Sequence, residues 1–131
     1  MSSPGITPFG TLAVVGLGLI GGSFARDVRR LGLADQLIGY DNNTVYREEI
    51  RSLNLVDYLA AAPDEKLAEA ELVLLAVPVK AFAKVLAQIR PHLSASAIVT
   101  DTGSVKSPLL KIMSTVDYSG ISFVGGHPIA G

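Results

Sequence analysis

Three short segments carry the residue types that could bind a nucleotide or move a proton. The first is residues 16–23, GLGLIGGS, which contains the spacing G-x-G-x-x-G. The second is residues 101–106, DTGSVK, and the third is residues 125–131, GGHPIAG. Glycines at this spacing allow a tight turn and bring backbone N–H groups close to phosphates. Histidine, present as His127, is the side chain that most readily exchanges a proton near neutral pH.

The glycine segment stands in the context that a dinucleotide-binding turn requires. It follows a short apolar run at residues 11–15 and opens a helical pattern over residues 18–31. The N-terminus of such a helix offers unpaired N–H groups to a pyrophosphate. A glycine-rich turn without a ligand is the alternative interpretation. We predict that the turn contacts the cofactor through Gly16, Leu17, Gly18, Leu19, Ile20 and Gly21.

An acidic residue follows the second predicted strand, where dinucleotide-binding units hold the adenosine ribose. Asp41 comes directly after residues 36–40 and lies twenty residues past Gly21. A carboxylate at this point accepts hydrogen bonds from ribose hydroxyls and repels a 2′-phosphate. Residues 42–44 bring no arginine to receive such a phosphate, so the sequence predicts NAD rather than NADP. Alternatively, Asp41 caps the next helix, although Asn43 would cap it equally well.

Polar residues after the later strands are candidates for the chemistry itself. Ser104 begins a predicted helix and is either an active-site hydroxyl or an N-cap, and its position alone favours the N-cap. His127 is the candidate acid or base in the predicted ligand crevice, or a strand-end histidine satisfied by the backbone. The other histidine, His92, follows a helix at the opposite end of the unit. Val77 and Pro78, at a strand exit, are predicted to wall the cofactor.

Short apolar runs alternate with helical patterns along the chain. The three segments each follow one of these runs, so the predicted strands position them. This alternation predicts an α/β fold of the Rossmann type, a doubly wound parallel sheet with helices on both faces. Residues 1–10, rich in Pro, Gly and Ser, are predicted to be a flexible tail, and residues 11–131 an NAD-binding domain. The predicted strands are 11–15, 36–40, 56–60, 72–77, 97–100 and 121–124; the predicted helices are 18–31, 44–53, 64–70, 80–90 and 105–116.

Apolar spacing predicts which face of the first helix packs on the sheet. Ile20, Phe24, Val28 and Leu31 share one face of residues 18–31, and Gly32 supplies the C-terminal stop.

Composition narrows the class of protein. The chain has 131 residues, of which 49% are hydrophobic and 18% charged, which excludes a disordered chain. A net charge of −1 gives no electrostatic basis for binding nucleic acid or a membrane surface. Without cysteine, and with two histidines, neither a thiol nucleophile nor a metal site is expected. No basic segment precedes the first apolar run, so we expect a cytoplasmic protein.

The three segments together resemble the prephenate/arogenate dehydrogenases of tyrosine biosynthesis, in order and in spacing. The glycine segment alone would also fit β-hydroxyacid dehydrogenases and pyrroline-carboxylate reductases, whereas residues 101–106 followed by 125–131 are more specific. The resemblance implies an NAD-dependent oxidative decarboxylation of prephenate to 4-hydroxyphenylpyruvate, or of arogenate to tyrosine. It further implies that His127 accepts a hydrogen bond from the substrate hydroxyl. Ser104 would then orient His127 or the nicotinamide amide.

The resemblance implies a family of enzymes with two domains. This chain resembles only their amino-terminal dinucleotide-binding domain. Their second, all-helical domain supplies the dimer interface and much of the substrate site. We therefore expect the 131-residue chain to bind NAD without turnover and to be monomeric or weakly associating. Two alternatives stay open. One is another NAD-dependent dehydrogenase of the β-hydroxyacid type, against which His127 argues; the other is a non-catalytic NAD-binding module.

Overall fold

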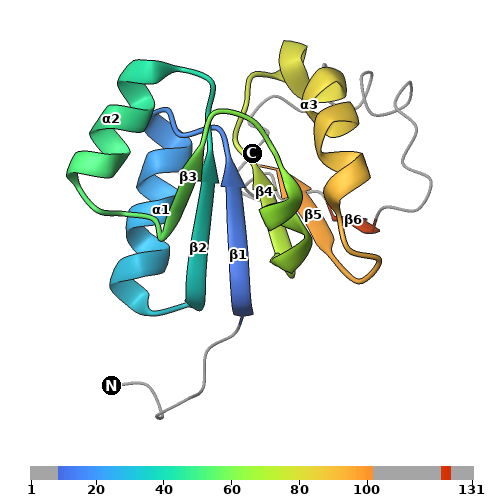
Figure 1. Ribbon diagram of the computed structural model, residues 1–131, viewed down its shortest axis with the longest axis horizontal. Helices are drawn as coiled ribbons and strands as arrows, with labels where there is room; N and C mark the ends of the chain where they lie inside the picture. The colour runs from blue at the N-terminus through green and yellow to red at the C-terminus, as the bar shows by residue number, and fades with distance from the viewer. Residues whose placement is uncertain (1–8, 102–121, 125–131) are drawn as a thin grey trace, which may run out of the picture.

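Parallel strands form a twisted central sheet with helices on both of its faces (Figure 1). The computed structural model describes residues 9–101 and 122–124, and within them six strands pair in the order β3-β2-β1-β4-β5-β6. Every neighbouring pair is parallel, which confirms the predicted doubly wound α/β fold. The strands are β1 (Phe9–Val15), β2 (Ala34–Tyr40), β3 (Tyr58–Ala60), β4 (Leu72–Leu75), β5 (Ile98–Asp101) and β6 (Ser122–Val124).

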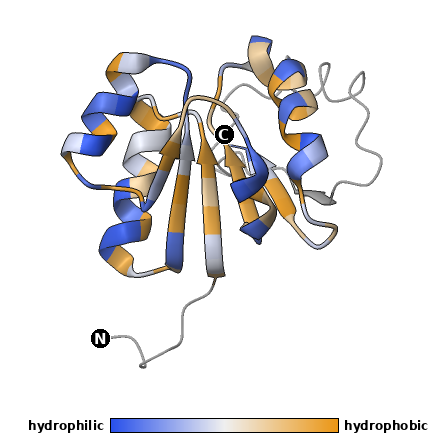
Figure 2. Ribbon diagram, viewed as in Figure 1, coloured by the Kyte–Doolittle hydropathy of each residue, from blue (hydrophilic) through white to orange (hydrophobic). Residues whose placement is uncertain are grey.

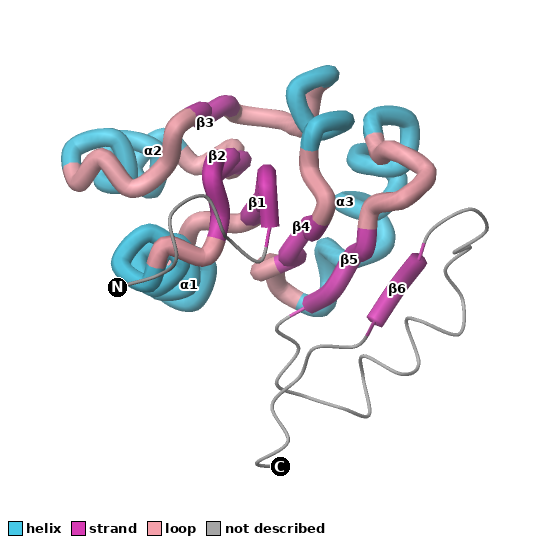
Figure 3. The backbone as a smooth tube through the Cα atoms, turned by 90° about the horizontal axis from the view of Figure 1, so that it is seen from below, coloured by secondary structure: helices cyan, strands magenta, loops and turns pink. Residues whose placement is uncertain are grey.

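The helices divide between the two faces of the sheet (Figure 3). Helices α1 and α2 cover one face, and α3 covers the other. Their bounds are α1 (Leu19–Leu31), α2 (Thr44–Ser52) and α3 (Phe82–Ile89), with short 3-10 segments η1 (Glu65–Glu69), η2 (Val79–Ala81) and η3 (Arg90–His92). None of the helices in the described ranges has the length and apolar character needed to cross a membrane.

Alternate residues of the strands build one hydrophobic cluster on each face, as parallel sheets covered on both sides require. In β1, Leu12 and Val14 pack with the α1 and α2 side, whereas Ala13 and Val15 pack with α3. Figure 2 shows the apolar strands between helices whose hydrophilic residues cover much of their outer surface.

The packing face of α1 differs in part from the predicted one. Ile20 and Leu31 are 55% and 53% exposed, and the buried residues of α1 are Gly21, Ala25 and Val28. A Cβ atom at Gly21 would overlap the carbonyl oxygen of Gly16. The helix therefore lies close to β1 at Gly21. Phe24 and Val28 pack toward the sheet as predicted, and Ile20 and Leu31 are exposed.

Element boundaries shift where hydrogen bonding extends or interrupts a pattern. Strand β1 begins at Phe9, which pairs with Ala34, so residues 9 and 10 of the predicted tail belong to the sheet. Residues 1–8 of that tail and the predicted helix at 105–116 lie outside the described residues. The predicted helix at 80–90 divides into η2, α3 and η3.

Candidate dinucleotide-binding site

The glycine turn joins the carboxyl end of β1 to α1, and two of its glycines are required by the fold. Gly16 has a φ of +100°, which L side chains rarely adopt, and its N–H donates to the carbonyl of Tyr40 at 2.7 Å. A side chain on Gly16 would also overlap the carbonyl oxygen of Ala76. Gly21, one turn into the helix, faces the carbonyl of Gly16. These two positions hold β1, β4 and α1 together at close range.

Gly18 differs from both, because the protein itself leaves room for a side chain there. It is the N-cap of α1 with a φ of −69°, and no side chain caps the helix. An ideal Cβ at this position would come within 3.4 Å of the Tyr46 ring, an ordinary van der Waals contact. Contacts within the described residues therefore do not require a glycine at position 18, and Gly18 lines the cavity.

Asp41 ties the glycine turn to the start of α2. Its Oδ2 accepts from the N–H of Leu17 at 2.6 Å, and its Oδ1 accepts from the N–H of Asn43 at 2.8 Å. The N-cap of α2 is Asn43, whose side chain accepts from the N–H of Tyr46 at 3.0 Å. The alternative interpretation of Asp41 as the cap of that helix is therefore wrong.

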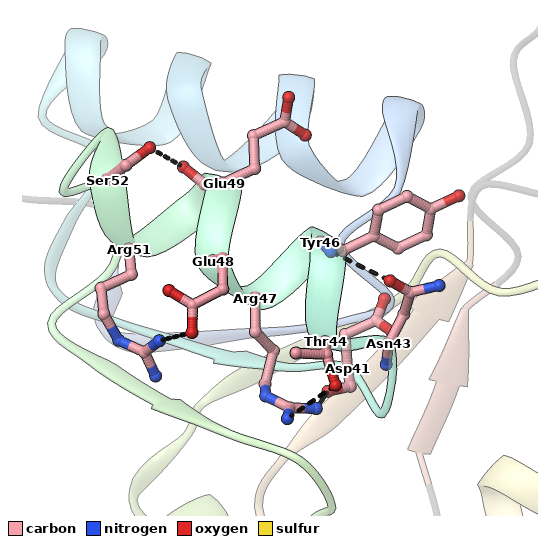
Figure 4. Close-up of polar contacts among 9 residues, drawn as sticks. All are labelled: Asp41, Asn43, Thr44, Tyr46, Arg47, Glu48, Glu49, Arg51 and Ser52. Carbon is pink, nitrogen blue, oxygen red and sulfur yellow. Dashed lines mark hydrogen bonds and ion pairs between the residues drawn. The ribbon is translucent and has the colours of Figure 1, made fainter.

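Arg47 lies beside Asp41. This contact was not predicted from the sequence. The Nη1 of Arg47 donates to the carbonyl oxygen of Asp41 at 2.9 Å, and its Nη2 lies 3.5 Å from the Thr44 hydroxyl (Figure 4). The prediction considered only residues 42–44 as a source of cations. A helical side chain three residues past Thr44 leans back over the preceding turn, which is the signal that could have identified Arg47.

A cavity of about 630 Å³ opens at the carboxyl edge of the central strands. Val15 at the end of β1 pairs with Tyr40 of β2 and Leu75 of β4, so the exits of all three strands meet there. Ligands of open α/β sheets bind at this edge. The predicted site residues that line the cavity are Gly16, Gly18, Leu19, Ile20, Asp41, Val77 and Pro78.

Other predicted residues lie beneath the cavity or outside the described ranges. The side chain of Leu17 is 2% exposed and belongs to the core, while its N–H is held by Asp41. Gly21 is buried against Gly16. Ser104 and His127 lie outside the described residues. No cluster of three or more potential metal ligands occurs in the parts of the chain that are described.

Sequence reasoning missed part of the cavity wall. Tyr46 of α2 and the residues that follow β3, 61–63, line it together with Asn42. Residues 61–63 come directly after a strand, so the rule that places ligands at strand ends would have included them.

Asp64 follows the lining residue Pro63 in the sequence, and its carboxylate is held by donors from the protein itself. Asp64 accepts from the hydroxyls of Tyr40 at 2.8 Å and Tyr58 at 2.5 Å, and from the N–H of Lys66 at 3.1 Å. Burial by itself raises the pKa of Asp64, but these donors outweigh it and hold the pKa below its ordinary value. Burial, followed by the hydrogen bond to Asp64, raises the pKa of Tyr40, so this hydroxyl stays protonated at neutral pH.

Strand order, glycine turn and anchored carboxylate together define a dinucleotide-binding domain of the Rossmann type. Within that class, the sequence model of the family "Prephenate dehydrogenase, nucleotide-binding domain" matches residues 24–131. The chain belongs to this family, which confirms the resemblance inferred from the three segments.

Individual relatives agree with this assignment. The chain is 37% identical over 126 residues to a cyclohexadienyl dehydrogenase of Zymomonas mobilis, covering 96% of this chain and 43% of the relative. A crystal structure of prephenate dehydrogenase from A. aeolicus, in complex with hydroxyphenyl propionate and NAD+, superposes with a TM-score of 0.77 at 33% identity. That match covers 93% of this chain and 42% of the other. Synechocystis arogenate dehydrogenase matches at 36% identity and a TM-score of 0.70, over 90% of this chain and 40% of the other.

The chain thus spans about two fifths of the length of these relatives. A 3-hydroxyisobutyrate dehydrogenase from Salmonella typhimurium also superposes, with a TM-score of 0.70, but at 18% identity it shares the fold alone.

Proposed function

We propose that this chain binds NAD in the cavity at the ends of β1, β2 and β4, as the cofactor-binding part of a prephenate or arogenate dehydrogenase. The observation that carries the proposal is the Asp41 carboxylate, which lines the cavity while the N–H of Leu17 fixes it to the glycine turn. An ionised carboxylate offers about four acceptor positions, so it has capacity for ribose hydroxyls besides these two backbone donors. The A. aeolicus relative, solved with NAD+, supports the choice of cofactor.

The residues present fit the parts of such a cofactor. Gly18 leaves the turn open where a pyrophosphate would approach, and Asp41 would hold the adenosine ribose. Val77 and Pro78, which follow β4, also line the cavity. NAD, when bound, would supply the hydride acceptor for the oxidation, and the protein would supply orientation and electrostatics.

We assign the proton chemistry to His127, as the family resemblance implies. A neutral imidazole there would accept the hydrogen bond of the substrate hydroxyl and take its proton during oxidative decarboxylation. Such assistance is worth on the order of 10²–10⁴ in rate. Ser104 would orient His127 or the nicotinamide amide. The substrate would be prephenate or arogenate, and Lys106, the last residue of the segment 101–106, is the candidate cation for a substrate carboxylate.

The composition supports a cytoplasmic enzyme acting on a small molecule, without a nucleic-acid or membrane partner. Its net charge of −1 provides no attraction to polyanions. In the relatives, the part of the chain beyond this match would contribute the remainder of the substrate site and a dimer interface.

Calorimetric titration of the chain with NAD and NADP tests the cofactor assignment. We expect NAD to bind and NADP to bind at least about tenfold more weakly, because a 2′-phosphate would lie next to the Asp41 carboxylate. A folded chain that binds no NAD would contradict the proposed function. Equal affinity for NADP would remove Asp41 from the ribose site.

Catalysis is tested in a chimera of this chain with the remaining part of the Zymomonas relative. His127→Asn should lower kcat on the order of 10²–10⁴-fold and change KM little, since it removes an interaction that strengthens in the transition state. The wild-type rate should fall at acid pH, because an imidazolium cannot accept the bond. Ser104→Ala should cost less. A folded His127→Asn enzyme with near-normal kcat would leave only the cofactor assignment standing.

A further inference from the structure

The end of β2 holds the glycine turn through three consecutive residues. The carbonyl of Tyr40 accepts from the N–H of Gly16 at 2.7 Å. The carboxylate of Asp41 accepts from the N–H of Leu17 at 2.6 Å. Gly39 leaves the space that the Leu17 side chain occupies, because a Cβ there would lie 3.1 Å from Leu17 Cδ1. One strand end therefore fixes two successive residues of the turn.

The residues fixed in this way end where the cavity begins. The side chain of Leu17 is 2% exposed and belongs to the core, whereas Gly18 lines the cavity and begins α1 without a side-chain cap. The first N–H groups of a helix have no partner within the helix and are the groups that bind an anion there. Their direction depends on the backbone that precedes them, so the contacts of Leu17 set how they face the cavity.

Asp41 differs from the other two contacts of the strand end, because its contact is made by a polar side chain. Tyr40 acts through its backbone carbonyl, and Gly39 acts through the lack of a side chain. The second carboxylate oxygen of Asp41 accepts from the N–H of Asn43 at 2.8 Å, so two backbone donors fix its orientation. Hydrogen bonds to a carboxylate are among the stronger ones in proteins. The turn therefore depends on Asp41 before any ligand arrives.

We infer that Asp41 is a positioning residue for the pyrophosphate site: through the N–H of Leu17 it fixes the glycine turn, independently of any contact with a ribose. The inference rests on the proposed function, because it takes the pyrophosphate to lie at Gly18. A binding site that is already ordered loses less conformational freedom when its ligand binds. A ligand without ribose hydroxyls should therefore still depend on the Asp41 side chain.

The test uses an analogue of NAD that lacks both hydroxyls of the adenosine ribose, titrated by calorimetry into Asp41→Asn and Asp41→Ala. Both variants lose the negative charge, so the relief of its repulsion of the phosphates is common to them. Asp41→Asn retains an oxygen that can accept from the N–H of Leu17, and Asp41→Ala retains none. We expect Asp41→Asn to bind the analogue about fivefold more tightly, the effect of one ordinary hydrogen bond.

Amide hydrogen exchange in the ligand-free proteins gives a second, independent measurement. The N–H of Leu17 should be protected in wild type and in Asp41→Asn, and it should exchange at least about fivefold faster in Asp41→Ala. Equal exchange in all three proteins would overturn the inference, because Asp41 would then not hold the turn.

Asn43→Ala is the matched control for the other contact of Asp41. It removes the side chain that caps α2 and leaves the bond between Asp41 and Leu17 in place. We expect the affinity for the analogue to stay within about twofold of wild type. A loss as large as the difference between the two Asp41 variants would assign the effect to α2 and overturn the inference.

A pair of leucine variants tests the turn without changing Asp41. Leu17→Ala removes a side chain that the ligand cannot touch, and Leu37→Ala removes an equally buried side chain of the same apolar cluster, on β2. Leu17→Ala should bind NAD at least about threefold more weakly than Leu37→Ala, because only the first change loosens the turn. Equal affinities would contradict the inference, also where Asp41→Ala does not fold or the analogue binds too weakly to measure.

The outcomes separate the inference from the proposed function. If wild type binds NAD and the analogue, and the two Asp41 variants bind the analogue equally, the inference is overturned while the proposed function stands. A folded wild type that binds neither ligand overturns both.

Discussion

Asp41 and Asp64 follow neighbouring strands of the same sheet, yet their carboxylates are held by different kinds of donor. Asp41 accepts from backbone N–H groups of two loops, those of Leu17 and Asn43, and lines the cavity. Asp64, which does not line the cavity, accepts from the hydroxyls of Tyr40 and Tyr58 in addition to the N–H of Lys66. Both residues are half-buried, but Asp41 lines the cavity, whereas Asp64 does not line it and is held by two tyrosine hydroxyls.

The glycines of the turn show the same division between internal and external roles. Gly21 lacks a side chain because Gly16 occupies the space. Gly18 lacks one although the protein offers ordinary contact distance. In each pair, one residue (Asp41 or Gly18) lines the cavity, and the other (Asp64 or Gly21) contacts only the protein. Substitutions should distinguish the two kinds of residue. Those at residues that contact only the protein should lower the free energy of unfolding, and those at residues that line the cavity should lower the affinity for NAD.

Gly21→Ala should have the largest effect, and it should be on stability. Its Cβ overlaps the carbonyl oxygen of Gly16, so α1 must move away from β1. We expect a loss of roughly 3–5 kcal/mol in the free energy of unfolding, measured in urea. Gly22→Ala is the matched control, because a Cβ there meets Leu17 and Ile50 at 3.5 and 3.6 Å. A Gly21→Ala chain as stable as wild type would show that α1 is not held at close range by this contact.

Gly18→Val should abolish NAD binding without loss of the fold. A side chain there obstructs the approach of a pyrophosphate to the backbone, and its Cβ would stand at ordinary contact distance from Tyr46, which is 40% exposed. We expect at least about 100-fold weaker binding, or about 2.7 kcal/mol, with a near-native circular dichroism spectrum. Retained affinity would remove the glycine turn from the phosphate site.

Asp64→Ala should lower stability and leave NAD affinity nearly unchanged, the reverse of the pattern at Gly18. It leaves the buried hydroxyl of Tyr40 without its acceptor and also removes the acceptor of Tyr58. The expected cost is about 2 kcal/mol in urea unfolding. Tyr58→Phe, which removes one donor and keeps the carboxylate, should cost about half as much. A loss of affinity larger than the loss of stability would place Asp64 in the ligand site instead.

The dependence of stability on acid pH also tests whether Asp64 is a structural residue. Because the folded pKa of Asp64 lies below its ordinary value of 3.8, the ionised form stabilises the fold above that value. This contribution is lost as the pH falls from about 3.8 through the lower folded pKa. Wild type should therefore lose stability relative to Asp64→Asn over that acid range and not near neutral pH. Parallel stability curves for the two proteins would show that Asp64 does not carry this pH dependence.

The parts of the fold that depend on local pattern could be predicted from the sequence, and those that depend on contact between elements could not. Apolar runs indicated the strands, and Asp41 was found because it follows one of them. The predicted packing face of α1 was right at Phe24 and Val28 and wrong at Ile20 and Leu31, because the close approach is made through Gly21 and Ala25. Tyr46 was missed because its approach to Gly18 depends on how α2 lies against the turn, whereas the local contact of Arg47 with Asp41 could have been predicted from helical spacing. Nothing in the spacing of Asp64 and its two tyrosines indicated that they meet.

Tyr46→Ala should have the smallest effect and decides why Gly18 has no side chain. The ring is 40% exposed and lines the cavity, so its removal should weaken NAD binding only about threefold and barely change stability. In the double variant Gly18→Ala, Tyr46→Ala, the new Cβ no longer meets the ring. If Gly18→Ala weakens binding because its methyl group opposes the phosphate, the loss should persist in the double variant. If the loss disappears with Tyr46, the methyl group acts by pushing the ring into the cavity, and Gly18 serves the position of Tyr46 rather than the cofactor directly.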